Sequence, residues 1–102
     1  RLSPSDADAQ QNFGLALNAQ GDAAGARDRF LRAQALRPEW ADPPIAAAWL
    51  LATGERRVRD APRALALAQQ AVRLTGGQDP RALDALAAAY AATGDQARAV
   101  TT

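Results

Sequence analysis

Two helix-boundary signals recur along this chain and constrain its fold more than any other feature. Gly21–Asp22 and Gly94–Asp95 each predict a tight turn between two helices, because glycine commonly ends a helix and aspartate caps the next one. Asp42–Pro43 and Asp79–Pro80 each predict the start of a helix, since proline is favoured at the first helical position. A repeated helix-turn-helix pattern is typical of a solenoid, in which each unit buries its apolar face against its neighbours.

The apolar residues between these signals recur at helical spacing, so we expect an all-α chain without strands. Polar caps and glycine or proline stops set the helix boundaries. We expect five helices and the beginning of a sixth. The first runs from a cap at Ser5 to about Gln20, the second from Ala23 to about Leu36 before Pro38, and the third from a cap at Asp42 to about Thr53. The fourth runs from a cap at Asp60 to Gly76–Gly77, the fifth runs from a cap at Asp79 to Gly94, and a sixth begins at Asp95.

The composition excludes most catalytic chemistry. Cysteine and histidine are absent and all 12 basic residues are arginine, which removes thiol, imidazole and lysine chemistry. No nucleophile–base pair, glycine-rich phosphate loop or metal-ligand spacing is present, so we expect no enzyme, no cofactor and no metal. The net charge of +1 argues against nucleic-acid binding, and the apolar runs are too short for membrane insertion.

Alanine accounts for 28 of the 102 residues, so the chain has few large side chains with which to fill a core. Its helices must therefore pack closely through small residues. We expect Gly14 and Ala33 where two helices approach, because a larger side chain there would push them apart. We expect Phe30 and Tyr90 to fill the spaces between helices.

The spacing of small and aromatic residues in the first unit resembles the tetratricopeptide repeat (TPR), a helix pair of about 34 residues. The matching positions are Phe13, Gly14, Leu17, Gly21, Ala26, Phe30, Ala33 and Pro38, and in a later unit Leu83, Leu86, Ala87, Tyr90, Gly94 and Ala99. The resemblance implies one domain over residues 1–102. Repeat 1 spans about 6–40, an irregular repeat 2 spans about 41–78, and a partial repeat 3 spans about 79–102.

The second unit departs from the family pattern. Pro43 and Ala46 replace large apolar residues, and Trp49 sits one place before the aromatic position. The segment Glu55 to Ala61 is longer than the usual turn. The stretch from Trp49 to Arg81 resembles a variant seen near the ends of repeat arrays in bacterial multi-domain proteins.

The resemblance also implies an architecture and a function. TPR units form a right-handed superhelical stack of antiparallel helix pairs, an α-solenoid. Such a stack acts as a non-catalytic protein–protein interaction scaffold, which binds a peptide or a partner domain in its concave groove. Carried onto this chain, the groove positions are Gln11, Leu15, Asn18, Ala48, Leu51, Arg81, Asp84 and Ala88.

One use of the family groove is a clamp of Lys, Arg and Asn side chains for a peptide's terminal carboxylate. Leu15 stands where that clamp needs Asn, so we expect no clamp in this chain. The alternative for all the groove positions is that they face solvent or a neighbouring repeat, since groove use is an analogy at the level of the fold.

Four arginines gather around the long turn of the second unit. One hypothesis is an anion-binding loop, because arginine forks suit phosphate and carboxylate groups. The other, which we favour, is a solvated loop with Glu55 and Asp60 as internal partners, the usual role of a charge run. The four residues are Arg56, Arg57, Arg59 and Arg63.

The alternative function is a structural spacer or self-assembly module of a larger multi-domain protein. A half-finished third repeat leaves the apolar stripe of Leu83, Leu86 and Tyr90 uncovered, so a second copy of the chain would cover it in a homo-oligomer. The short segment from Asp95 to Thr102 is expected to fray, because isolated short helices are marginal in water.

Overall fold

The computed structural model describes residues 6–101, and the side chains of residues 6–94. This part of the chain is entirely helical and contains no strand, which confirms the all-α prediction. The five helices are α1 (Ala7–Ala19), α2 (Ala23–Leu36), α3 (Asp42–Thr53), α4 (Ala61–Leu74) and α5 (Pro80–Thr101).

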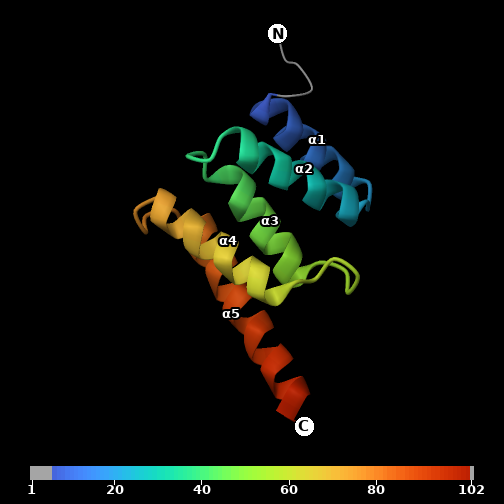
Figure 1. Cartoon of the computed structure of the whole chain (residues 1–102), viewed down its shortest axis with the longest axis vertical. Helices are drawn as coiled ribbons and strands as arrows, with labels where there is room; N and C mark the ends of the chain where they lie inside the picture. The colour runs from blue at the N-terminus through green and yellow to red at the C-terminus, as the bar shows by residue number, and fades with distance from the viewer. Residues whose placement is uncertain (1–5, 102) are drawn as a thin grey trace.

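Helices that follow one another in the sequence also pack against one another. α1 contacts α2, α2 contacts α3, and α3, α4 and α5 all contact one another. Figure 1 shows α1 and α2 at one end of the molecule, α3 in the middle, and α4 with α5 at the other end. Because α3 touches three other helices, it connects the two ends of the fold.

Three of the predicted aspartate caps are present. Asp22 Oδ1 accepts a hydrogen bond from the backbone N–H of Gly25 at 2.9 Å, at the start of α2. Asp60 Oδ1 accepts from Arg63 N at 3.3 Å, and Asp79 Oδ1 accepts from Arg81 N at 2.9 Å. Each carboxylate pairs with a backbone N–H that has no partner within its helix.

Two of the predicted caps differ from the structure. Ala41 occupies the cap position of α3, and Asp42 lies inside the first turn, where its carboxylate accepts from Arg81 instead of from the backbone. At α1 the cap position is Asp6, without a side-chain cap bond, and Ser5 lies outside the described residues.

The predicted turn at Gly94–Asp95 is wrong, because α5 continues through it as one helix to Thr101. Gly21, which does form a turn, has a φ of +88°, whereas Gly94 is not among the glycines with positive φ. After Gly21, the chain brings Phe30 and several fully buried alanines into the core. At Gly94 the backbone keeps its helical conformation, so the hydrogen bonds of α5 continue through this position. The predicted partial third repeat therefore contains a single helix in the described part of the chain, and Thr102 lies outside it.

The core is built from small residues that let helices approach closely. Phe30 is 1% exposed and packs against Gly14, where an added Cβ would lie 2.6 Å from Cε1 of the ring. Ala33 is also fully buried, which confirms the predicted close approach of α1 and α2. The prediction for Tyr90 is wrong, because its side chain is 52% exposed on α5. α3 is buried most completely, through Pro43, Pro44, Ile45, Ala47, Ala48, Leu50, Leu51 and Ala52.

Replacing Phe30 by alanine should lower the free energy of unfolding by about 3–5 kcal/mol, because the ring is 1% exposed and its loss leaves a cavity in the core. Phe13→Ala is the matched control, since Phe13 is half exposed in the neighbouring helix and should cost far less. Urea denaturation of both variants measures the difference. Equal losses would show that Phe30 is not the central contact between α1 and α2.

Gly94→Ala should stabilise the protein by up to about 1 kcal/mol, because alanine is the better residue inside a helix. Nothing lies within 4 Å of a Cβ built at this position, so no clash opposes the gain. Gly21→Ala should instead destabilise by about 1 kcal/mol, since its φ lies in the left-handed region. Thermal denaturation of the two variants measures both effects. Destabilisation by Gly94→Ala would support the turn that the sequence predicts at Gly94–Asp95.

Candidate functional site

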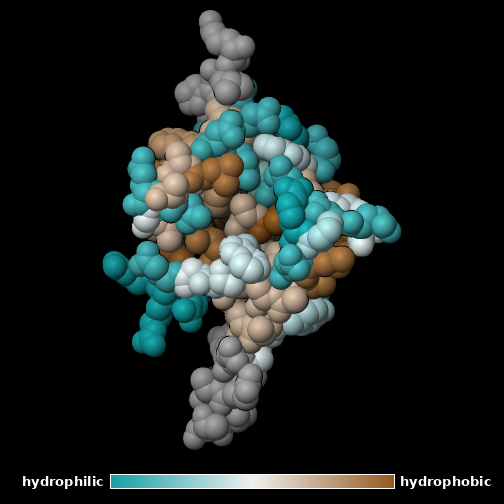
Figure 2. Space-filling view, turned by 180° about the vertical axis from the view of Figure 1, so that it is seen from behind, coloured by the Kyte–Doolittle hydropathy of each residue, from teal (hydrophilic) through white to brown (hydrophobic). Residues whose placement is uncertain are grey.

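An open cavity of about 390 Å³ lies between α1, α3 and α5. We call it the α1–α3–α5 groove. Most of its wall is apolar, with Asn18, Arg81 and Asp84 as its polar members. Figure 2 shows the side of the molecule turned away from Figure 1, where apolar side chains gather in a hollow with polar ones around it. The residues that line the groove are Leu15, Asn18, Phe30, Ile45, Ala46, Trp49, Leu50, Arg81 and Asp84.

Two large apolar side chains on the groove wall are half exposed. Trp49 on α3 and Leu15 on α1 each have 50% of their surface accessible to solvent. Trp49 lies four residues before Thr53. The Thr53 hydroxyl donates a hydrogen bond to the Trp49 carbonyl at 2.7 Å. An aromatic side chain left half exposed on a concave wall is the feature most typical of a binding surface.

The structure brings together four of the eight residues predicted for the groove. Leu15 and Asn18 come from α1, and Arg81 and Asp84 come from α5. The remaining four lie elsewhere. Ala48 and Leu51 are core residues, and Gln11 is also buried. Ala88 is half-buried against the core. The buried Oε1 of Gln11 has no hydrogen-bond partner among the described residues.

The sequence reasoning missed Ala46 and Trp49, which line the groove in place of Ala48 and Leu51. The repeat pattern assigns the groove face of α3 by analogy, and this helix is rotated from that assignment. Ala48 and Leu51 belong to the core cluster, so the opposite face turns toward the groove. The unusual position of Trp49 in the repeat pattern was the available signal.

Arg81 joins the beginnings of α3 and α5. Its Nη2 donates to Asp42 Oδ1 at 3.0 Å and to Asp79 Oδ2 at 2.7 Å, and its Nε donates to Asp79 Oδ1 at 3.2 Å. The side-chain hydrogen bond from Arg81 holds the pKa of Asp79 below its usual value, and the same bond raises the pKa of the guanidinium. Asp84, one helical turn further along α5, has no hydrogen bond or ion pair within residues 6–94.

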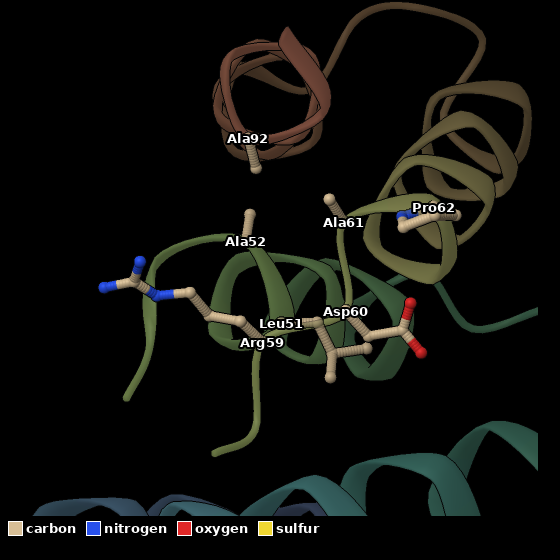
Figure 3. A pocket seen from close by; sticks show the side chains of 7 residues that line it. All are labelled: Leu51, Ala52, Arg59, Asp60, Ala61, Pro62 and Ala92. Atoms are coloured by element: carbon tan, nitrogen blue, oxygen red, sulfur yellow. The ribbon is translucent and has the colours of Figure 1, made fainter. Parts of the chain in front are cut away.

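A second cavity of about 510 Å³ lies where α3 ends and α4 begins, next to Ala92 of α5. Figure 3 shows Ala52, Ala61 and Ala92 extending toward the space between their helices. The guanidinium of Arg59 and the carboxylate of Asp60 point away from one another. Both have structural contacts, since Arg59 Nε donates to the Gly54 carbonyl at 2.7 Å and Asp60 caps α4. The alanine side chains that point into the cavity are methyls, and both charged side chains at its wall are engaged in contacts within the fold.

The arginine-rich turn is held to the fold by its backbone. Val58 is buried in the core, and Asp60 N donates to the Leu51 carbonyl at 3.0 Å. The arginines around it, Arg56, Arg57, Arg59 and Arg63, are all exposed. None of them forms an ion pair with Glu55 or Asp60 in the described part of the chain, so the expected internal partners are not engaged. Anion binding by this loop stays a prediction.

Comparison of the chain with protein-family models, with curated proteins and with solved structures found no match. Among the described residues, no three acidic side chains come close enough together to hold a metal ion. No helix in this same part of the chain has the length and apolar character needed to cross a bilayer.

Proposed function

We propose that this chain is a non-catalytic protein-interaction module that binds a peptide or a segment of a partner domain in the α1–α3–α5 groove. The observation that carries the proposal is the half-exposed Trp49 beside Leu15 on the wall of an open apolar cavity. Large exposed apolar side chains are stabilised when a partner removes them from water, and tryptophan is prominent among the residues that dominate interface energies.

The architecture we propose is a TPR-like stack of antiparallel helix pairs. Its first pair is α1–α2, its second is α3–α4, and α5 begins the third. The contact between Gly14 and Phe30, and the full burial of Ala26 and Ala33, support this proposal, because these are positions of the repeat signature. Most residues that line the groove come from α1, α3 and α5, which would be the first helices of the three units in the proposed stack, and Phe30 of α2 also lines it.

The groove suits binding because rigid elements surround it. Ile45 and Leu50 belong to buried parts of α3, and Phe30 is anchored in the core. A partner side chain that enters the groove therefore meets a preformed apolar wall and does not need to order a loop. Its contact with Trp49 and Leu15 supplies the apolar part of the affinity.

Trp49→Ala should weaken peptide binding at least about 30-fold, the loss expected when a central aromatic contact is removed. The probe is a set of 12-residue peptides selected from a random phage-displayed library on the wild-type chain, then synthesised and measured by calorimetry. Tyr90→Ala is the matched control, because Tyr90 is equally exposed on α5 but does not line the groove. Binding that survives Trp49→Ala, or a library that yields no binder, would contradict the proposal.

A second candidate function is supported by the outer face of α5. Leu83 and Tyr90 are 44% and 52% exposed, and the neighbouring Ala87 and Ala91 are also exposed, so this face is unusually apolar. Such a surface suits a structural spacer or self-assembly module, in which a second copy or another repeat covers it. Leu86, predicted to share this stripe, is partly buried and packs against the core instead.

If self-assembly is the function, the sedimentation-average mass of the chain should rise with concentration. Leu83→Glu combined with Tyr90→Glu should abolish the rise, because it places charges on the contact face. Trp49→Ala should leave the rise unchanged, since Trp49 lies on the groove wall. A wild-type chain that sediments as a monomer at every concentration would reject the second candidate and leave the first unaffected.

A further inference from the structure

The α1–α3–α5 groove is acidic at the end formed by α5. Arg81 and Asp84 are the two charged residues on its wall. Arg81 is ion-paired with Asp42 and Asp79, and Asp84 lies one helical turn further along α5, so this end carries three acids and one arginine. The cluster therefore carries an excess of two negative charges, and its field favours a cationic group.

The Nε and Nη2 groups of Arg81 are already engaged by acids of the chain itself. Its guanidinium already donates to both neighbouring carboxylates, at 2.7 Å to Asp79 and 3.0 Å to Asp42. A peptide carboxylate that approached the remaining Nη1 group would lie beside Asp42 and Asp79, and their negative charges would repel it. Asn18 of α1 is the other polar residue on the groove wall, and its neutral amide both donates and accepts, so it does not select a charge.

Asp84 carries the unpaired charge among the described residues of the groove wall. Its side chain is exposed, it lines the groove, and it has no partner among the described residues. A carboxylate accepts strong hydrogen bonds from lysine ammonium and arginine guanidinium groups. These contacts strengthen when an apolar partner excludes water from the groove wall beside them.

We propose that the occupant of the groove is a partner segment with a bulky apolar side chain next to a lysine or arginine. The apolar side chain packs against Trp49 and Leu15, and the basic side chain pairs with Asp84. This inference rests on the proposed function of the groove and adds the charge of its ligand. The preferred charge is opposite to that of the terminal carboxylate for which the TPR clamp is known.

The test uses the same random 12-residue phage library, selected on the full wild-type chain. The selected peptides should be enriched in lysine and arginine beside aromatic or aliphatic residues. Asp84→Asn should weaken their binding by about tenfold, the effect of removing one charge-assisted contact, and should flatten its salt dependence. Asp28→Asn is the matched control, because Asp28 is an exposed acid of α2 that does not line the groove.

A charge-reversal variant distinguishes loss of the ion pair from a general disturbance of the site. Asp84→Lys should bind the selected peptides still more weakly, and should bind better those in which glutamate replaces the basic residue. Circular dichroism and thermal denaturation confirm that these surface variants fold as the wild type does.

Two results would overturn the inference, and they are distinguishable from failure of the proposed function. Selected peptides without an excess of basic residues would reject the preferred charge. So would equal binding to the wild type and to Asp84→Asn. If Trp49→Ala still abolishes binding in either case, the groove remains the binding site and only the assignment of charge is wrong.

Discussion

The burial of α3 against α2, α4 and α5 is the constraint on which the rest of this structure depends. Ala47 and Ala48 are fully buried, and Leu51 is nearly so, which lets the neighbouring helices approach the α3 backbone. The same orientation leaves the opposite face of α3, with Ala46 and Trp49, facing the groove. One set of contacts therefore holds the two ends of the fold together and exposes the aromatic side chain that we propose for binding.

Packing through alanine has an energetic consequence. Each buried alanine removes little apolar surface from water, so the core depends on its few large side chains and on close contact between backbones. Phe30 against Gly14 is the clearest case, since the glycine leaves the space that the ring occupies. Arg81 contributes differently, by joining Asp42 of α3 to Asp79 of α5 at the edge of the groove.

Local signals in the sequence predict most of the helices but only part of the site. The bounds of α2 are reproduced, and the caps at Asp22, Asp60 and Asp79 form as expected, because capping depends on residues a few positions apart. Gly94–Asp95 repeats the signal of Gly21–Asp22 and yet lies within a helix, because Gly94 does not take the positive φ that Gly21 takes in its turn. The rotation of α3, which exposes Trp49 and buries Ala48 and Leu51, depends on three neighbouring helices, and the shifted position of Trp49 in the repeat pattern is its only local signal.

The central claim, that α3 is the helix around which the others pack, is tested most directly by native-state hydrogen exchange. The amides of α3 should exchange most slowly, and those of α1 much faster, because α1 packs substantially only against α2. We expect the slowest exchange in α3, with protection decreasing toward α1. Protection in α1 equal to or greater than that in α3 would contradict it.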